Sequence, residues 1–322
     1  MTIAEFLPAR PDLTWKLARQ IGVNHAIVKA APELTGAKPP WDIDSLHAIQ
    51  TRFREGGFTL SGLEGDQFDM QRIKLGREGR DEDIALYQKM LSNMGELGIP
   101  LLCYNFMATI GWCRTAVRVP ARGGAWTNRF DLAEAEPSPV PEADRTSEEQ
   151  LWENYRYFIL SVLPAAERAG VAMGLHPDDP PLSPLRGVGR IFSTPGGFSG
   201  AMALSESSSH GITFCQANFV AMNADLEACV NGFAPRIKYI HFRDIRGTAE
   251  SFEETFQDDG PTDMARMLRL YQKAGLDVPI RVDHVPTMEG EENHAHGYGF
   301  LGRLFAVGYM KGIMDTCQIP YR

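Results

Sequence analysis

Long hydrophobic runs are absent from this sequence of 322 residues. Nowhere do about 18 apolar residues follow one another, so no transmembrane helix is expected. The segment MTIAEFLPARPDLTWKLARQ lacks the basic stretch followed by an apolar one that marks a secretion signal. Cysteine is scarce, and five widely spaced residues do not suggest a disulfide framework. We therefore expect a cytoplasmic protein with reduced thiols and no membrane contact.

A basic surface is missing as well. The chain has 32 Lys and Arg against 41 Asp and Glu, a net charge of -9, and its basic residues are dispersed. Nucleic-acid partners are therefore not expected, because they require clustered positive charge. The motifs GxxxxGK[ST], GxSxG, HExxH and CxxC are absent, so P-loop, serine-hydrolase and zinc-protease chemistries lose their usual support.

Short apolar segments alternate with helical ones along most of the chain, a rhythm typical of parallel strands joined by helices. The length suits one (β/α)8 TIM barrel, so we expect a single domain over residues 1–322. An irregular inserted loop is expected at about 107–145, and another at 177–200. Neither the first ten residues nor RGVGRIFS makes a convincing eighth strand. The seven strand candidates are VNHAIVK, FTLSGLE, IPLLCYN, VAMGLH, ITFC, IKYIH and PIRVD.

Four potential metal ligands each end one of these apolar segments: His176, Cys215, His241 and Asp283. If the segments are parallel strands of one barrel, the four side chains emerge at the same rim and can meet at one divalent cation. Imidazole, thiolate and carboxylate are competent ligands for Mn²⁺, Fe²⁺, Co²⁺ or Zn²⁺, and the residues alone do not choose among them. Taken singly, each is more often a packed or hydrogen-bonded side chain. Their equivalent positions favour a shared metal site.

Two residues near the fourth ligand are candidates for proton transfer. His284 follows Asp283 directly, and the pKa of an imidazole beside a metal responds strongly to the ion. Tyr298, in HAHGYG, is a phenol that can exchange a proton if a nearby cation lowers its pKa. The structural alternative for His284 is a ring that only supports the ligands or that faces outward from the barrel.

Four further residues are predicted to bind the substrate. Arg114 and Arg129, in the loop after the third strand candidate, are suited to clamp a carboxylate through two hydrogen bonds. Asn105 ends that strand and is placed to bind a hydroxyl group. His25 lies in the first strand candidate, where a histidine satisfied within the core is the equal alternative.

Several motifs together resemble the mannonate dehydratase family, in the same order from about residue 73 to 312. The resemblance implies a TIM barrel of the xylose-isomerase-like group with Mn²⁺ or Fe²⁺. It also implies conversion of D-mannonate to 2-keto-3-deoxy-D-gluconate in hexuronate breakdown. The motifs are IKLGREGRDEDIALYQ, GIPLLCYNFM, LHPDDPP, GRIFSTP, ITFCQANF, YIHFRD, VDHVPTMEG and GYGFLGRLFAVGYMKG.

The resemblance also implies roles for single residues. The family's metal ligands fall on the four strand-end residues already identified. His284 and Tyr298 match its proton-transfer residues, and Asn105 and Arg114 match its substrate-contacting loop.

The chain departs from the family pattern at four positions. Gly111 and Cys113 stand where Asp and Thr are expected, Val282 where Pro is common, and Gln257 where His is usual. These departures bear on the substrate contacts and on activity.

The preferred hypothesis is therefore a metal-dependent sugar-acid dehydratase that acts on a small molecule and forms a homo-oligomer. One alternative is a sugar isomerase or epimerase on the same barrel, which moves a proton without losing water. Such enzymes usually hold their metal with several carboxylates, which the set with Cys215 and two histidines does not match. Another alternative is a catalytically impaired homologue that binds a sugar acid.

Overall fold

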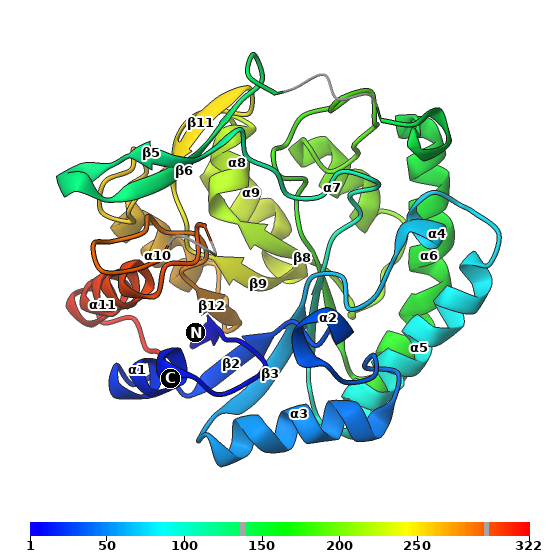
Figure 1. Cartoon of the computed structure of the whole chain (residues 1–322), viewed down its shortest axis with the longest axis horizontal. Coiled ribbons are helices and arrows are strands. Elements are labelled where there is room, and N and C mark those ends of the chain that lie inside the picture. Colours follow the sequence, from blue (N-terminus) through cyan, green and yellow to red (C-terminus); the bar gives the residue numbers. More distant parts are fainter. Residues whose placement is uncertain (136–139, 293–295) are drawn as a thin grey trace.

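Eight parallel strands form a closed barrel in the order β1-β12-β9-β8-β7-β4-β3-β2. The computed structural model describes residues 1–135, 140–292 and 296–322. Helices surround the strands (Figure 1), so the predicted (β/α)8 architecture is confirmed. The barrel strands are β1 (Thr2–Phe6), β2 (His25–Val28), β3 (Thr59–Glu64), β4 (Leu101–Tyr104), β7 (Ala172–Leu175), β8 (His210–Cys215), β9 (Ile237–His241) and β12 (Pro279–Arg281).

The eighth strand is β1, at the start of the chain, which the sequence analysis did not recognise. It pairs with β12 through Ile3 and Ile280 and with β2 through Ala4 and His25, and so closes the barrel. The segment was missed because it is short and carries the charged Glu5. That side chain is nevertheless buried, and its charge is matched by an arginine of the last helix.

The helices lie around the outside of the barrel. Within the described residues, no helix is both long enough and apolar enough to cross a membrane. The helices are α1 (Leu13–Gln20), α2 (Pro32–Thr35), α3 (Ile43–Glu55), α4 (Gln71–Lys74), α5 (Arg80–Glu96), α6 (Glu148–Ala169), α7 (Pro195–Met202), α8 (Gln216–Ala221), α9 (Leu226–Phe233), α10 (Met264–Lys273) and α11 (Phe300–Thr316), with 3-10 turns η1 (Arg122–Gly124), η2 (Glu142–Asp144) and η3 (Ala234–Arg236).

The longest helix, α6, shows how local sequence sets an element's limits. Ser147 caps its start by accepting a hydrogen bond from the backbone N–H of Gln150, which leaves one fewer unpaired donor. Gly170 ends it in the left-handed conformation with φ 65°, which glycine adopts without strain. Between these caps one face is buried against the barrel and α5, and the opposite face is exposed.

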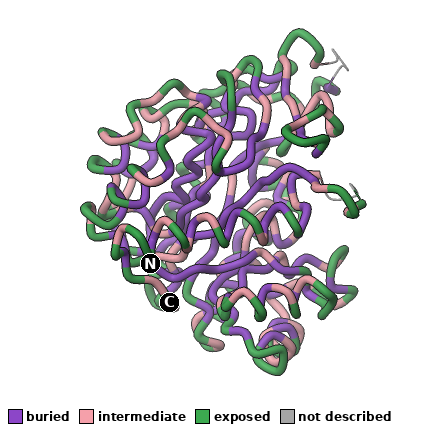
Figure 2. Tube along the Cα trace, turned by 90° about the vertical axis from the view of Figure 1, so that its left-hand side faces the viewer, coloured by how far each residue is buried: buried purple, intermediate pink, exposed green. Residues whose placement is uncertain are grey.

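Buried residues lie in the interior of the molecule and exposed ones mainly at its outside (Figure 2). The buried residues form an inner and an outer layer on the two sides of the barrel strands. Side chains alternate along each strand, so one set points into the barrel and the other toward the helices. The inner set is a small apolar cluster that contains Ala4, Ile27, Leu101 and Tyr239. The outer set belongs to the large cluster between strands and helices.

A second sheet of four antiparallel strands has the order β10-β11-β6-β5. Its strands are β5 (Ala116–Pro120), β6 (Trp126–Asp131), β10 (Ile245–Thr248) and β11 (Ser251–Glu254). The region at 107–145 was expected to be irregular, but it contributes β5 and β6, so that expectation was wrong for these residues. The segment after β9 supplies the other two strands. The sheet therefore joins two distant segments that both follow carboxyl ends of barrel strands.

Candidate metal centre and active site

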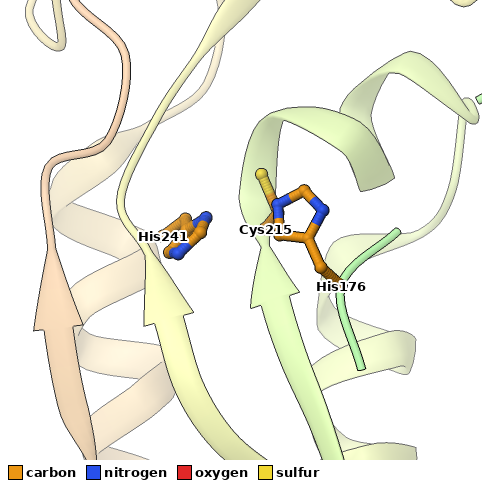
Figure 3. Close-up of side chains that lie close together, drawn as sticks. All are labelled: His176, Cys215 and His241. Carbon is orange, nitrogen blue, oxygen red and sulfur yellow. The ribbon is translucent and has the colours of Figure 1, made fainter. Parts of the chain in front are cut away.

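Three of the four predicted ligands lie together at the carboxyl ends of neighbouring strands. The ligand atoms of His176, Cys215 and His241 all lie within 4.8 Å of one another. Figure 3 shows His241 and Cys215 at the ends of adjacent strands, with His176 on the segment beside them. Cys215 and His241 are direct partners in the β8–β9 pairing, which places their side chains next to each other.

The fourth predicted ligand, Asp283, borders this group. Its Oδ2 lies 3.5 Å from His241 Nδ1 and 3.8 Å from Cys215 Sγ. Asp283 has a left-handed backbone conformation with φ 56°. This interrupts the strand alternation, so Asp283 and the following His284 both line the same cavity. Aspartate tolerates this conformation better than most side chains.

The surroundings of His241 fit a cation. The ring is buried, and neither nitrogen has a hydrogen-bond partner among the described residues. Burial and the nearby Arg281 lower the pKa of His241, but Asp283 and Glu64 outweigh them and raise it to about 10. The ring is therefore buried without a hydrogen bond between two carboxylates, where positive charge at its nitrogens is favoured, and such a position suits a metal ligand.

The tautomer of His176 and the ionisation of Cys215 also suit metal binding. His176 Nδ1 lies 2.7 Å from the carbonyl oxygen of Pro177, which can only accept, so Nδ1 carries the proton and Nε2 is left for an ion. Burial raises the pKa of the Cys215 thiol, but Arg243 and the two histidines lower it to about 6. The thiolate, which is the form that binds metals, is therefore accessible near neutral pH.

A second group, Glu64, Cys103 and His241, has ligand atoms equally close together. It fits a metal less well. Burial raises the pKa of Cys103 well above its usual value, which keeps it a neutral thiol. Arg281 Nη2 donates to Glu64 Oε1 at 2.5 Å and to Asp283 Oδ1 as well, so this contact does not separate the two groups, and the state of the thiol decides. The first group, with Asp283, is therefore the better candidate for a divalent metal.

The predicted proton-transfer residues lie beside the centre and in contact with each other. His284 Nε2 is 3.1 Å from the Tyr298 hydroxyl, and His284 Nδ1 is 3.1 Å from Glu254 Oε1. The indole of Trp112 packs edge-on against the imidazole, with ring centres 5.4 Å apart. Burial and the nearby Asp283 raise the pKa of Tyr298, so the phenol is protonated at neutral pH.

The four residues predicted to bind substrate have different locations. Asn105 lines the cavity of about 120 Å³ that also contains the centre. Its Oδ1 accepts from Lys74 Nζ at 3.0 Å and from the Met107 N–H, which fixes the orientation of the amide.

The side chain of Arg114 is fully buried beneath the wall of this cavity rather than free within it. Nη1 donates to Asp179 Oδ1 at 2.6 Å and to the Cys113 carbonyl, and Nη2 donates to Asp179 Oδ2 and to Glu254 Oε1. Nε donates to Glu254 at 3.1 Å. All five N–H groups are thus engaged. A substrate carboxylate reaches this guanidinium only if one of these bonds exchanges.

The other two lie away from the cavity. Arg129, on β6, pairs with Glu134 at 2.6 Å. His25 is the first residue of β2, at the amino end of the barrel and therefore opposite the cavity, and its Nδ1 bonds Ser61 Oγ at 2.9 Å. The structure does not bring these two together with the other site residues.

The sequence analysis did not identify two arginines that contact the predicted metal ligands Cys215 and Asp283. Arg243 Nη1 lies 3.6 Å from Cys215 Sγ and 3.3 Å from Asp283 Oδ2. Arg281 Nη2 donates to Asp283 Oδ1 at 2.7 Å, which leaves Oδ2 facing the centre. Each stands two residues from a predicted ligand on the same segment, Arg243 two residues after the end of β9 and Arg281 at the end of β12.

One departure from the family pattern has a structural role. The Gln257 side-chain amide donates to the carbonyl oxygens of Val282 at 2.9 Å, of His284 at 3.2 Å and of Phe242 at 3.4 Å. These carbonyls belong to the segments that carry His241 and Asp283. Gln257 therefore ties together the backbones of two ligand-bearing segments.

Fold and site together define a (β/α)8-barrel enzyme whose cavity combines a candidate divalent-metal centre with a histidine–tyrosine pair. Residues 10–322 match the family described as D-mannonate dehydratase (UxuA), and the chain belongs to this family of hydro-lyases.

Individual relatives agree with this placement. A mannonate dehydratase of Oceanobacillus iheyensis is 30% identical, over 95% of this chain and 94% of that protein. Mannonate dehydratase 2 of Halalkalibacterium halodurans is 29% identical, over 86% of this chain and 88% of its own. The crystal structure of mannonate dehydratase from Streptococcus suis serotype 2 superposes with a TM-score of 0.87 at 26% identity and covers 98% of this chain and 95% of that one.

Proposed function

We propose that this chain dehydrates D-mannonate to 2-keto-3-deoxy-D-gluconate, with Mn²⁺ or Fe²⁺ as its metal. The observation that supports this most directly is the convergence of imidazole, thiolate and carboxylate donors beside the His284–Tyr298 pair, in a member of this family. The proposed substrate, D-mannonate, is taken from the relatives, which are named mannonate dehydratase.

His176, Cys215, His241 and Asp283 would hold the cation. Two imidazoles, a thiolate and a carboxylate are competent ligands for Mn²⁺, Fe²⁺, Co²⁺ and Zn²⁺ alike, so the choice of Mn²⁺ or Fe²⁺ rests on the family resemblance. When bound, the cation supplies Lewis-acid stabilisation of the negative charge that develops on the sugar acid. Five free thiols, one of them a ligand, fit a reducing compartment such as the cytoplasm.

The protein's own residues move the protons. One member of the His284–Tyr298 pair takes the proton from C2, and the electron pair of that bond forms the C2–C3 double bond as the C3–O bond breaks. The other member gives its proton to the departing hydroxyl, which leaves as water. The enol then ketonises at C2, which yields the 2-keto-3-deoxy acid. Because the two groups are hydrogen-bonded to each other, a proton can pass between them after each turnover.

The sugar chain is oriented by the cavity wall. The Asn105 amide, whose oxygen already accepts two hydrogen bonds, presents its N–H₂ group as a donor to a substrate hydroxyl. Arg114 contributes positive charge from beneath the wall and, after exchange of one of its ion pairs, a direct contact to the carboxylate.

The test is incubation of the Mn²⁺-loaded protein with D-mannonate, followed by mass spectrometry and a keto-deoxy-acid assay. A product lighter by one water is expected. A product of unchanged mass would identify an isomerase or epimerase and contradict the proposal. Binding that raises the melting temperature without turnover would instead identify a sugar-acid-binding homologue, and would contradict it equally.

A further inference from the structure

A carboxylate from the second sheet contacts the proton-transfer pair. Glu254, the last residue of β11, is fully buried, and its Oε1 lies 3.1 Å from His284 Nδ1. The Thr127 hydroxyl of β6 donates to the Glu254 carbonyl at 2.9 Å, so the neighbouring strand holds the residue in place. We infer that Glu254 is a positioning residue that fixes the tautomer and ring orientation of His284. This inference rests on the proposed function.

The geometry determines which nitrogen of His284 carries the proton. Burial raises the pKa of Glu254, but Arg243 and Arg114 outweigh it and lower the pKa to about 2, so the carboxylate can only accept hydrogen bonds. Nδ1 must therefore donate to Oε1. In the neutral ring Nε2 is then the nitrogen without a proton, and it faces the Tyr298 hydroxyl at 3.1 Å. The ring is thus held with its basic nitrogen toward the phenol and the cavity.

This contact gives the second sheet a function. Glu254 lies 30 positions before His284 in the sequence and reaches it only because β10 and β11 fold back against β6. The sheet delivers one carboxylate to the imidazole and anchors it with two arginines, Arg114 and Arg243.

The chain offers a matched control in Asp179. This carboxylate is also buried and pairs with the same two arginines, with Arg114 Nη1 at 2.6 Å and Arg243 Nη1 at 3.0 Å. It has no hydrogen bond to His284 in the contacts described. Loss of either carboxylate weakens the ion pairs with Arg114 and Arg243, but only Glu254 accepts a hydrogen bond from the imidazole of His284.

The first experiment compares Glu254→Gln with Asp179→Asn in the Mn²⁺-loaded enzyme. Glutamine leaves one accepting oxygen for five N–H groups of three side chains, and among these side chains only the imidazole can move its proton to the other nitrogen. We expect kcat of Glu254→Gln to fall about 100-fold or more with KM changed by less than about threefold. We expect Asp179→Asn to lose much less in kcat. An equal loss in both would assign the effect to the ion pairs and overturn the inference.

The second experiment observes the tautomer directly and needs no turnover. Nitrogen NMR of the Zn²⁺-loaded protein with ¹⁵N-labelled histidine, assigned with His284→Asn, should show Nδ1 protonated in the wild type and a changed tautomer in Glu254→Gln. A wild-type ring protonated at Nε2 alone would overturn the inference, even if Glu254→Gln does not fold. If the wild type fails to dehydrate D-mannonate, the proposed function fails, while the tautomer still decides the role of Glu254.

Discussion

Cys215 shows how strongly its neighbours decide what a single residue can do. Cys103 and Cys215 are both fully buried barrel thiols, yet the pKa of Cys103 is raised and that of Cys215 is lowered to about 6. Burial raises both pKa values, and only the guanidinium and imidazoles near Cys215 reverse the effect. The same residue type is thus a core side chain at one position and a metal ligand candidate at the other.

The two thiols allow a direct test of which group binds the metal. Cys215→Ser should weaken Co²⁺ binding at least about 100-fold, because a serine hydroxyl does not ionise as the thiol does and is a poorer ligand. It should also abolish the near-ultraviolet absorption of a cobalt–thiolate bond. Cys103→Ser, the control, should bind Co²⁺ like the wild type. The reverse result would place the ion at Glu64 and Cys103 instead.

The buried ring of His210 should make the free energy of unfolding depend on pH. It is buried at the start of β8, with Nε2 3.1 Å from the Tyr155 hydroxyl, and burial together with Arg236 lowers its pKa from the ordinary 6.5 to about 4. As the pH falls below 6.5, the unfolded chain takes up a proton on this ring before the folded chain does. The free energy of unfolding should therefore fall between pH 6.5 and 4, by roughly 3 kcal/mol from this residue alone.

Urea unfolding of the wild type and His210→Gln at pH 7, 5.5 and 4.5 measures this contribution. The difference in unfolding free energy between the two proteins should shrink or change sign on acidification. Parallel pH profiles would show that the ring titrates equally in both states.

At the scale of elements, β1 is held by the last helix as well as by its strand partners. Glu5 of β1 and Arg303 of α11 form an ion pair at 2.9 Å, with side chains 1% and 6% exposed. Arg303 also donates to the Phe6 carbonyl at 2.6 Å. The pair links the strand that closes the barrel to the helix that ends the chain.

Removal of one partner should leave a buried charge unpaired. Arg303→Met is expected to lower the free energy of unfolding by about 3–5 kcal/mol, and the double variant Glu5→Gln/Arg303→Met should recover part of the loss. Urea denaturation measures both. The control is Glu227→Gln, which breaks an exposed pair with Arg266 and should cost less than about 1 kcal/mol. Similar losses in the buried and exposed variants would contradict this role.

For the whole molecule, a metal at the centre would join four units of the barrel. Its proposed ligands follow or end β7, β8, β9 and β12, so an ion bound only by the folded chain must stabilise all of them together. Free metal at 100 times Kd should add about 2.7 kcal/mol to the free energy of unfolding. Calorimetry should show a melting temperature that rises with metal concentration, falls with a chelator, and responds little in Cys215→Ser. A metal-independent melting temperature would contradict a bound ion.

Much of the architecture was readable from local sequence. Seven strands and the helices between them were predicted because their apolar periods are regular, and β1 was missed because Glu5 interrupts that pattern. The inserted region was expected to be irregular because it is rich in Gly, Pro and charge. Its strands β5 and β6 are mostly half-exposed, and β6 finds its second partner, β11, far along the chain. Pairing between distant segments leaves no local signal.

The sequence by itself determined where the proposed ligands lie, because parallel strands in a barrel bring their carboxyl ends to one rim whatever the loops do. Only the tertiary structure decided which charges meet there. Arg114 became the partner of Asp179 and Glu254, Arg129 and His25 fell outside the cavity, and Glu254 reached His284. Pairing of buried charges depends on distances of a few ångströms between segments remote in sequence, and no spacing along one strand fixes those distances.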